Sequence, residues 1–118
     1  MQMRSLLRSF SGSISDAKEG RQELRPLPSP VFRYSQPDQG VIDGGLFVFA
    51  RSTNPELFLL IEAQVVQNER RWMFSPARMT GRDCELRYLA EQVWSQPTVG
   101  RERDRERTYL QLNTQFPD

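Results

Sequence analysis

Apolar and polar side chains alternate along the middle of the chain, from about residue 31 to residue 95. A period of two residues is typical of β-strands that turn one face to a core and the other to solvent. Short polar breaks rich in Gly, Pro, Asn and Asp separate the alternating segments, as turns do between neighbouring strands. The pattern predicts six strands, at residues 31–35, 41–50, 57–66, 71–79, 84–89 and 92–95.

Strands in series with short connections favour an antiparallel arrangement, and no β-α-β alternation that would indicate a parallel sheet is visible. We therefore expect an all-β fold, a small antiparallel meander that closes into a sandwich or barrel. Residues 46–50 are apolar on both faces, which predicts an interior strand. Asn54 and Pro55 are expected in the turn that follows it. Pro76 donates no hydrogen bond to a ladder, so its strand is expected to lie at a sheet edge or to bulge there.

Residues 1–29 lack this alternation, and we expect them to form a flexible, mobile N-terminal arm. Asp16 and Glu19 have the spacing of a helix capping box, which allows a short helix over residues 17–24. The prolines of "RPLPSP", residues 25–30, predict an extended connector. The opening "MQMRSLLRSFSGSIS" is basic and Ser-rich like a transit peptide, so a processed targeting segment stays open as an alternative.

The rest of the chain is expected to form a single β domain, residues 30–115. After Gly100 the sequence becomes "RERDRER", residues 101–107, in which Arg alternates with acidic residues. This pattern is typical of a solvated linker or a charged edge strand. The segment "TYLQLN", residues 108–113, alternates again and is a candidate for a last strand.

Composition excludes several kinds of site. The chain has no histidine, which removes Ser-His-Asp and Cys-His mechanisms and every histidine metal site. Cys84 is the only cysteine, so no internal disulfide can form. The 16 basic and 15 acidic residues nearly cancel, and no apolar run reaches the ~18 residues that a membrane helix needs. We expect no cofactor, no metal, no membrane or nucleic-acid partner, and a cytoplasmic location.

Three segments carry a resemblance to known proteins: "IDGGLFVFARSTNPELFLLIEA", "ARMT" and "CELRYLAEQVW". Together they resemble a family of uncharacterised bacterial proteins with an Asp-Gly-x-Leu-Phe core, a Pro-Glu-x-x-Leu-Leu-Ile-Glu-Ala strand and an Ala-Arg-Met segment. The resemblance covers residues 30–95. It implies that Asp43, Glu56, Glu62 and Arg78 lie in family-defining stretches, and it implies no activity, cofactor or ligand.

Asp43 and Glu62 are the acidic residues whose positions suggest a site. In a hairpin of the two apolar strands they come close together across the strand pair. Two carboxylates at a suitable separation can hydrolyse a glycoside or bind a hard cation such as calcium. Arg78 can instead neutralise them in a bidentate ion pair that fixes the sheet. We take the ion pair as the main hypothesis and a hydrolase with an Asp43/Glu62 carboxylate pair as the third functional hypothesis.

Trp72 and Trp94 have two possible roles. A domain of this size needs large aromatic side chains in its core, and this is the simpler explanation. Exposed on one face, the same aromatics would stack on sugars or single-stranded bases, as in other small β folds. Phosphate contacts in that case would come from Arg33, Arg71 and Arg87.

The sequence therefore favours a non-catalytic interaction or binding module. Its expected partner is another protein, or a second copy that associates through a sheet edge next to Pro76 or at residues 101–107. The alternative is a ligand-binding β domain for carbohydrate or single-stranded nucleic acid, using exposed aromatics and Arg. The candidate binding residues are Trp72, Trp94, Arg78, Asp43 and Glu62.

Overall fold

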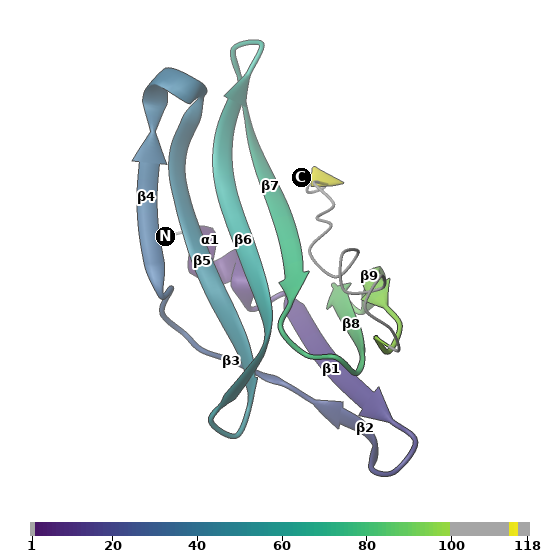
Figure 1. The fold of residues 1–118 in the computed structure, drawn as a ribbon. Helices are drawn as coiled ribbons and strands as arrows, with labels where there is room; N and C mark the ends of the chain where they lie inside the picture. The colour runs from purple at the N-terminus through teal and green to yellow at the C-terminus, as the bar shows by residue number, and fades with distance from the viewer. Residues whose placement is uncertain (1, 100–113, 116–118) are drawn as a thin grey trace.

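The computed structural model describes residues 2–99 and 114–115, most of which lie in β-strands (Figure 1). The elements are α1 (Gln2–Leu7), β1 (Phe10–Asp16), β2 (Gly20–Glu23), β3 (Arg25–Pro26), β4 (Phe32–Gln36), the 3-10 turn η1 (Pro37–Gln39), β5 (Val41–Arg51), β6 (Asn54–Val66), β7 (Glu69–Arg78), β8 (Asp83–Tyr88), β9 (Glu91–Gln96) and β10 (Thr114–Gln115).

The strands form two antiparallel sheets. The small sheet has the order β2-β1-β8-β9, and the large sheet has the order β10-β7-β6-β5-β3, with β4 also paired to β5. Consecutive strands β5, β6 and β7 are long neighbours and make a meander. The expected all-β antiparallel fold is confirmed, and each of the six strands that the alternation predicts is present as one of β4 to β9.

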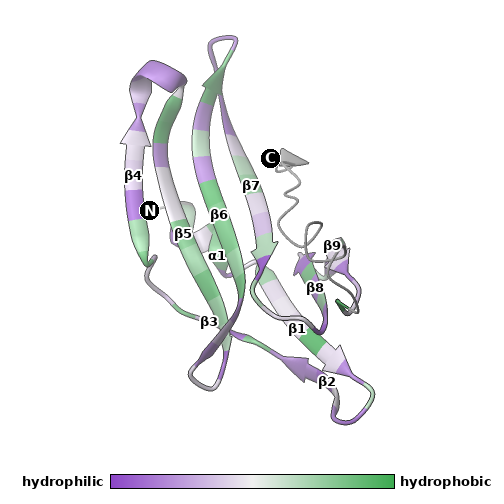
Figure 2. Cartoon of the chain, viewed as in Figure 1, coloured by the Kyte–Doolittle hydropathy of each residue, from purple (hydrophilic) through white to green (hydrophobic). Residues whose placement is uncertain are grey.

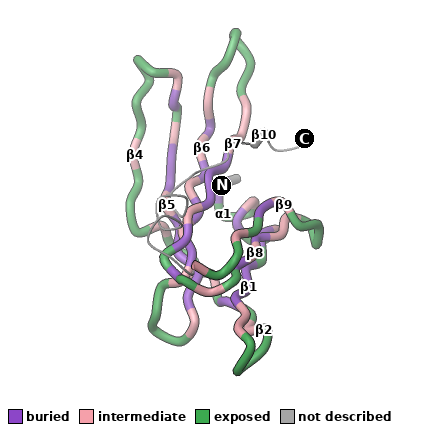
Figure 3. The backbone as a smooth tube through the Cα atoms, turned by 45° about the vertical axis from the view of Figure 1, so that its right-hand side comes forward, coloured by how far each residue is buried: buried purple, intermediate pink, exposed green. Residues whose placement is uncertain are grey.

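The core lies between the two sheets, and both sheets contribute to it. Along β6 the buried positions are Leu57, Leu59, Ile61 and Ala63, which is the face that the alternation of that strand predicts. Figure 3 shows the buried middle of β5, β6 and β7 and the exposed β4 and hairpin tips. The remaining large side chains of the core are Met3, Leu7, Phe10, Ile14, Leu24, Phe47, Phe49, Phe74, Leu86 and Trp94.

The N-terminal segment differs most from the expectation. Where a flexible arm over residues 1–29 was expected, α1, β1, β2 and β3 form, and β1 lies between β2 and β8 in the small sheet. Met3 and Leu7 of α1 and Phe10 and Ile14 of β1 are all buried in the core. The structured domain therefore begins before residue 30 and includes this segment.

Small residues hide the strand pattern of β1. The inward position between Phe10 and Ile14 is Gly12, where an added Cβ would lie 3.2 Å from Leu57 Cδ1 and 3.3 Å from Phe49 Cδ2. The close approach of β1 to the large sheet thus leaves little room for a side chain at this position. The positions between are serines, so a half-buried strand has the composition of a flexible tail.

The capping-box spacing at Asp16 serves a turn instead of the expected helix. Asp16 Oδ1 accepts hydrogen bonds from the backbone N–H groups of Lys18 (3.0 Å) and Glu19 (2.6 Å). The bond from Glu19 contributes most to lowering the pKa of Asp16. The same side chain that would begin a helix therefore closes the β1–β2 hairpin.

At the other end of the chain, β10 pairs with β7 at Met73 and Phe74. Pro76 lies in β7 beyond the part of the strand that β10 covers, which agrees with the expected edge position. The expected charged strand or linker at residues 101–107 and the expected strand at residues 108–113 lie outside the described residues.

Candidate functional site

Asp43 forms an ion pair with Arg33 of the neighbouring strand β4. Arg33 Nε donates to Asp43 Oδ1 at 2.9 Å and Arg33 Nη2 to Asp43 Oδ2 at 2.5 Å, so the pair is bidentate. The hydrogen bond from Arg33 is the main reason that the pKa of Asp43 is below its usual value, while partial burial opposes it. Asp43 is therefore engaged by Arg33 and not by Arg78 as expected.

Glu62 accepts hydrogen bonds from the Tyr34 hydroxyl and from Gln64 Nε2, the second at 2.7 Å. Tyr34 reaches it across Gly44, where an added Cβ would lie 2.5 Å from Tyr34 Cζ. Only glycine lets the ring lie this close to the backbone of β5. Burial, and then the bond to Glu62, raise the pKa of Tyr34, so its hydroxyl stays protonated and keeps donating.

A β-bulge separates Asp43 from Glu62. The register of β5 against β6 shifts by one residue at Glu56, which lies opposite no residue of β5 in the strand pairing. Glu62 consequently lies opposite Gly44, and Asp43 lies opposite Ala63. Since neighbouring residues of a strand point to opposite faces, the two carboxyl groups project from opposite faces of the sheet. The structure does not form the carboxylate pair that a glycosidase or a calcium site needs.

The two acids instead fasten the edge strand β4 to the sheet. Arg33 and Asp43 hold it on one face, and Tyr34 and Glu62 hold it on the other. Side-chain contacts on both faces stabilise the pairing of the edge strand β4 with β5, so we assign both acids a structural role.

Arg78 lies at the other end of the large sheet, opposite Leu57 of β6, and is only 4% exposed. Its Nη1 donates to the backbone carbonyl oxygens of Arg82 (3.5 Å) and of Pro97, and its Nε has no hydrogen-bond partner among the described residues. Burial raises the pKa of the neighbouring Cys84 thiol, and the charge of Arg78 partly opposes this. The expected ion pair of Arg78 with Asp43 or Glu62 is therefore not formed.

The candidate tryptophans belong to the core. Trp94 is 3% exposed, and Trp72 is half-buried and packs against the same core cluster. Phe74 is also buried and meets the ring of Phe10 edge-on at 5.3 Å between centroids. The structure thus does not support an aromatic platform built on Trp94, because the indole has no free face to offer a sugar or a base.

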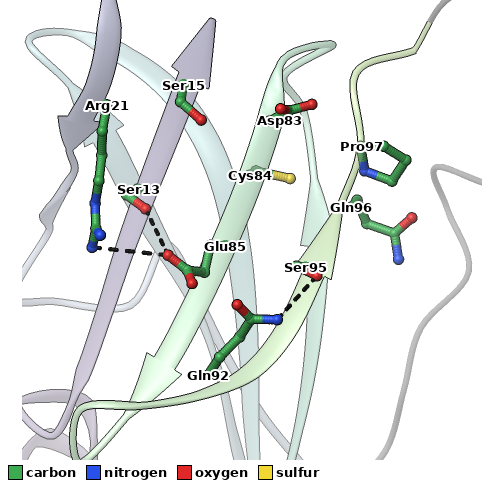
Figure 4. A pocket seen from close by; sticks show the side chains of 10 residues that line it. All are labelled: Ser13, Ser15, Arg21, Asp83, Cys84, Glu85, Gln92, Ser95, Gln96 and Pro97. Atoms are coloured by element: carbon green, nitrogen blue, oxygen red, sulfur yellow. Dashed lines mark hydrogen bonds and ion pairs between the residues drawn. The ribbon is translucent and has the colours of Figure 1, made fainter.

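The outer face of the small sheet carries a polar hollow of about 400 Å³ (Figure 4). Glu85 lies at its centre, where it accepts a hydrogen bond from Ser13 Oγ at 3.3 Å and pairs with Arg21 and Arg87 at 3.8 and 3.2 Å. Asp83 at its rim accepts two bonds from Thr98, at 2.5 and 2.7 Å. Both carboxylates of this hollow are therefore already satisfied by neighbouring groups of the chain.

The outer face of the large sheet has the opposite character, and we call it the apolar face. The core takes the residues on one side of β5 and β6, which leaves the alternate side chains on the other side. Directly paired residues confirm the shared side, as with Leu46 against Leu60 and Val48 against Phe58. Figure 2 shows the hydrophobic residues that dominate the lower halves of β5 and β6. The apolar face comprises Phe32, Leu46, Val48, Phe58, Leu60 and Ala77.

A groove of about 440 Å³ lies at one end of the apolar face, beside β3 and the β5–β6 turn. Val48 and Ala50, both buried, and Phe58 belong to its lining. Leu27 and Val31 line it from the segment between β3 and β4, and Val31 is 56% exposed. The lining is therefore mainly hydrocarbon.

The polar groups of this groove come from β3 and from the turn between β5 and β6. Arg25 Nη2 donates to the backbone carbonyl oxygen of Ser52 at 3.0 Å, and Ser52 and Thr53 complete that part of the lining. Ser52 has a positive φ of 54°. The expected turn at Asn54 and Pro55 thus lies earlier in the chain, at Ser52 and Thr53, and Pro55 belongs to β6.

Sequence reasoning missed this groove because its walls come from the proline-rich connector. Leu27 belongs to the expected connector and Val31 begins the expected strand 31–35, and their N–H groups bond to the carbonyl oxygens of Val48 (2.9 Å) and Leu46 (2.8 Å). The connector is thus held along the edge of β5. The available signal was Leu27 between Pro26 and Pro28 and Val31 directly after Pro30, because a solvated linker does not need such apolar residues.

No family model, no curated protein and no solved structure shows a significant match to the chain. Within residues 2–99 and 114–115, no group of three or more His, Cys, Asp or Glu side chains is placed to hold a metal ion. In the same described part of the chain, no helix is long and apolar enough to cross a membrane.

Proposed function

We propose that the chain is a non-catalytic binding module and that the apolar face is its binding surface. One observation carries the proposal: the large sheet has two apolar faces, and the described elements bury the core side but leave Phe32 exposed and Leu46, Phe58 and Leu60 partly exposed on the other. The small sheet and α1 both pack on the core side, where Phe47 and Leu59 point. Large contiguous apolar patches are rare on monomeric proteins and usually mark a binding surface.

The other candidate chemistry supports a binding role over catalysis. Asp43 and Glu62 each have a hydrogen-bonded partner and project from opposite faces. The charged groups of the polar hollow are satisfied by neighbours within the small sheet. The hydrocarbon side chains of the apolar face have no hydrogen-bonding or charged partner to find on their own surface. They lose their contact with water only when another molecule covers them.

The test is capture of partners from the native lysate by the tagged full chain, in three forms. These are the wild type, Leu60→Glu in the centre of the apolar face, and Ser95→Glu, an exposed position on the small sheet, as the matched control. The introduced carboxylate at residue 60 should abolish capture, because a buried unpaired charge costs several kcal/mol. The Ser95→Glu control should capture the same partners as the wild type.

Thermal unfolding of both variants establishes that each is folded before capture is compared. Equal capture by the wild type and Leu60→Glu would contradict the proposal, and loss of capture with Ser95→Glu alone would move the binding surface to the small sheet.

A further inference from the structure

We propose that the groove at the end of the apolar face binds a monocarboxylate with an apolar body, such as an alkyl carboxylate, and that Arg25 receives the carboxylate. This names a ligand class for one end of the binding surface proposed above, and it rests on that proposal. Three features carry it: the size of the groove, the chemistry of its lining, and the free charge of Arg25.

The size and lining fit a small apolar ligand. The groove has a volume of about 440 Å³, and small-molecule sites are typically apolar clefts of ~300–1,000 Å³ with a few polar groups that set the orientation. Here Val48, Ala50 and Phe58 offer hydrocarbon to the ligand body. The polar groups of Arg25, Ser52 and Thr53 come from β3 and one turn. A ligand that matches this arrangement has a single polar end.

The charge of Arg25 sets the sign of that polar end. Arg21, Arg33 and Arg51 each form an ion pair with a carboxylate of the chain. Arg25 forms none with any described residue, and its one side-chain hydrogen bond to a described residue runs from Nη2 to the Ser52 carbonyl oxygen. That bond holds the guanidinium beside the groove and leaves its other N–H groups available. A planar guanidinium is well suited to a carboxylate, with which it can form two parallel hydrogen bonds.

The lining also distinguishes a hydrocarbon ligand from a peptide. A peptide laid in the groove would bury its own N–H and C=O groups and would need partners for them. The backbone N–H groups of Leu27 and Val31 are already bonded to β5, and Pro28 and Pro30 have none to offer. A strand therefore cannot form a ladder along this wall. An alkyl or arylalkyl body has no polar groups to satisfy and loses nothing on burial.

The experiment measures binding of decanoate and of the neutral analogue decanol to the full chain by calorimetry, at concentrations below micelle formation. Decanoate should bind the wild type with one site. Decanol should bind at least about tenfold more weakly, because it lacks the charge-assisted bonds to Arg25. Amide spectra of the labelled protein should show decanoate-induced shifts at Val31, Ala50 and Phe58.

Variants assign the contacts. Arg25→Gln should weaken decanoate binding at least about tenfold and leave decanol binding unchanged, whereas Arg25→Lys should keep part of the preference for the carboxylate. Arg70→Gln, an exposed arginine at the far end of β7, is the matched control and should bind decanoate like the wild type. Ala50→Trp should fill the groove and abolish binding of both ligands. Thermal unfolding shows that each variant is folded.

Equal affinities of the wild type for decanoate and decanol, shifts confined to another surface, or no binding at all would each overturn the inference. The proposed function stands or falls separately. Capture that is lost in Leu60→Glu while decanoate fails to bind would keep the apolar face as a protein-binding surface and remove only the carboxylate ligand.

Discussion

The outer faces of the two sheets differ in how they satisfy their own chemistry. On the small sheet, Glu85 is held by Ser13 and two arginines, so each charge has its counterpart on the same surface. On the large sheet, Leu46 pairs with Leu60 and with Phe32, hydrocarbon side chains that form no hydrogen bond or ion pair. Polar groups can be compensated within one surface, but exposed hydrocarbon costs roughly 25 cal/mol for each Å² left in water. The outer face of the large sheet is therefore the surface that releases more free energy when a partner covers it.

The largest expected effect concerns whether both faces belong to one folded unit. Deletion of residues 1–16 removes α1 and β1, and with them Met3, Leu7, Phe10 and Ile14 from the core. Each buried side chain of this kind contributes ~1.5–3 kcal/mol, and small domains have only ~5–15 kcal/mol in total. Thermal unfolding of the truncated chain should therefore lose its cooperative transition. A transition within ~5 °C of that of the full chain would mean that the rest of the protein folds without α1 and β1. The two outer faces would then not belong to one folded unit.

The next effect concerns the upper border of the apolar face, where Tyr34 lies on Gly44. Gly44→Val places a Cβ about where the Tyr34 ring is, which should displace the ring, break its bond to Glu62 and cost ~2–3 kcal/mol in urea unfolding. Gly81→Val is the control, because nothing lies within 4 Å of a Cβ there. If the two variants were equally stable, the packing of Tyr34 on Gly44 would not fix this border.

A third effect compares the two faces directly. Leu60→Lys on the apolar face should shorten retention of the purified protein on a hydrophobic-interaction column, because it interrupts the centre of the apolar surface. Ser95→Lys on the outer face of the small sheet, which we call the polar face, should leave retention close to that of the wild type, and both proteins should remain folded. Retention that falls equally in the two variants would mean that the faces do not differ in accessible hydrocarbon.

The smallest effect is the pH dependence of the Arg33–Asp43 pair. The pKa of Asp43 is lowered in the folded protein, so its contribution is present above the ordinary aspartate pKa of ~3.9 and is lost as the pH falls through the folded value. The stability difference between wild type and Asp43→Asn should therefore be constant from about pH 5 to 7 and shrink below about pH 4. A difference that persists unchanged into acid would show that the pair contributes nothing through its charge.

The sequence predicted the strands well wherever large apolar residues alternate with polar ones, as they do along β6. It failed for β1, because Gly12 takes an inward position and serines surround it. It also failed for the acids, because one extra residue at Glu56 moves Asp43 to the other face from Glu62. A bulge has no distinctive composition at this position, so the register of β5 against β6 could not be read from the alternation alone.

The groove was equally hidden, for a related reason. Leu27 of its wall lies between Pro26 and Pro28, and Val31 of its wall follows Pro30. Its floor at Val48 belongs to a strand that is apolar on both faces. Such a strand predicts burial on both sides, and the structure buries its core side and also Val48 and Ala50 on the outer side, while Leu46 is only partly buried. How far the outer side of this strand is covered is visible only once the sheets and the connector are placed.

The most direct test of the binding surface is a pair of amide spectra of the isotope-labelled full chain, one of the purified protein and one of the protein in its native lysate. We predict that signals of Leu46, Val48, Phe58 and Leu60 shift or broaden in the lysate, while those of the polar face, such as Ser13 and Gln92, stay in place. Changes confined to the polar face, or identical spectra in both samples, would contradict the assignment of the apolar face as the binding surface.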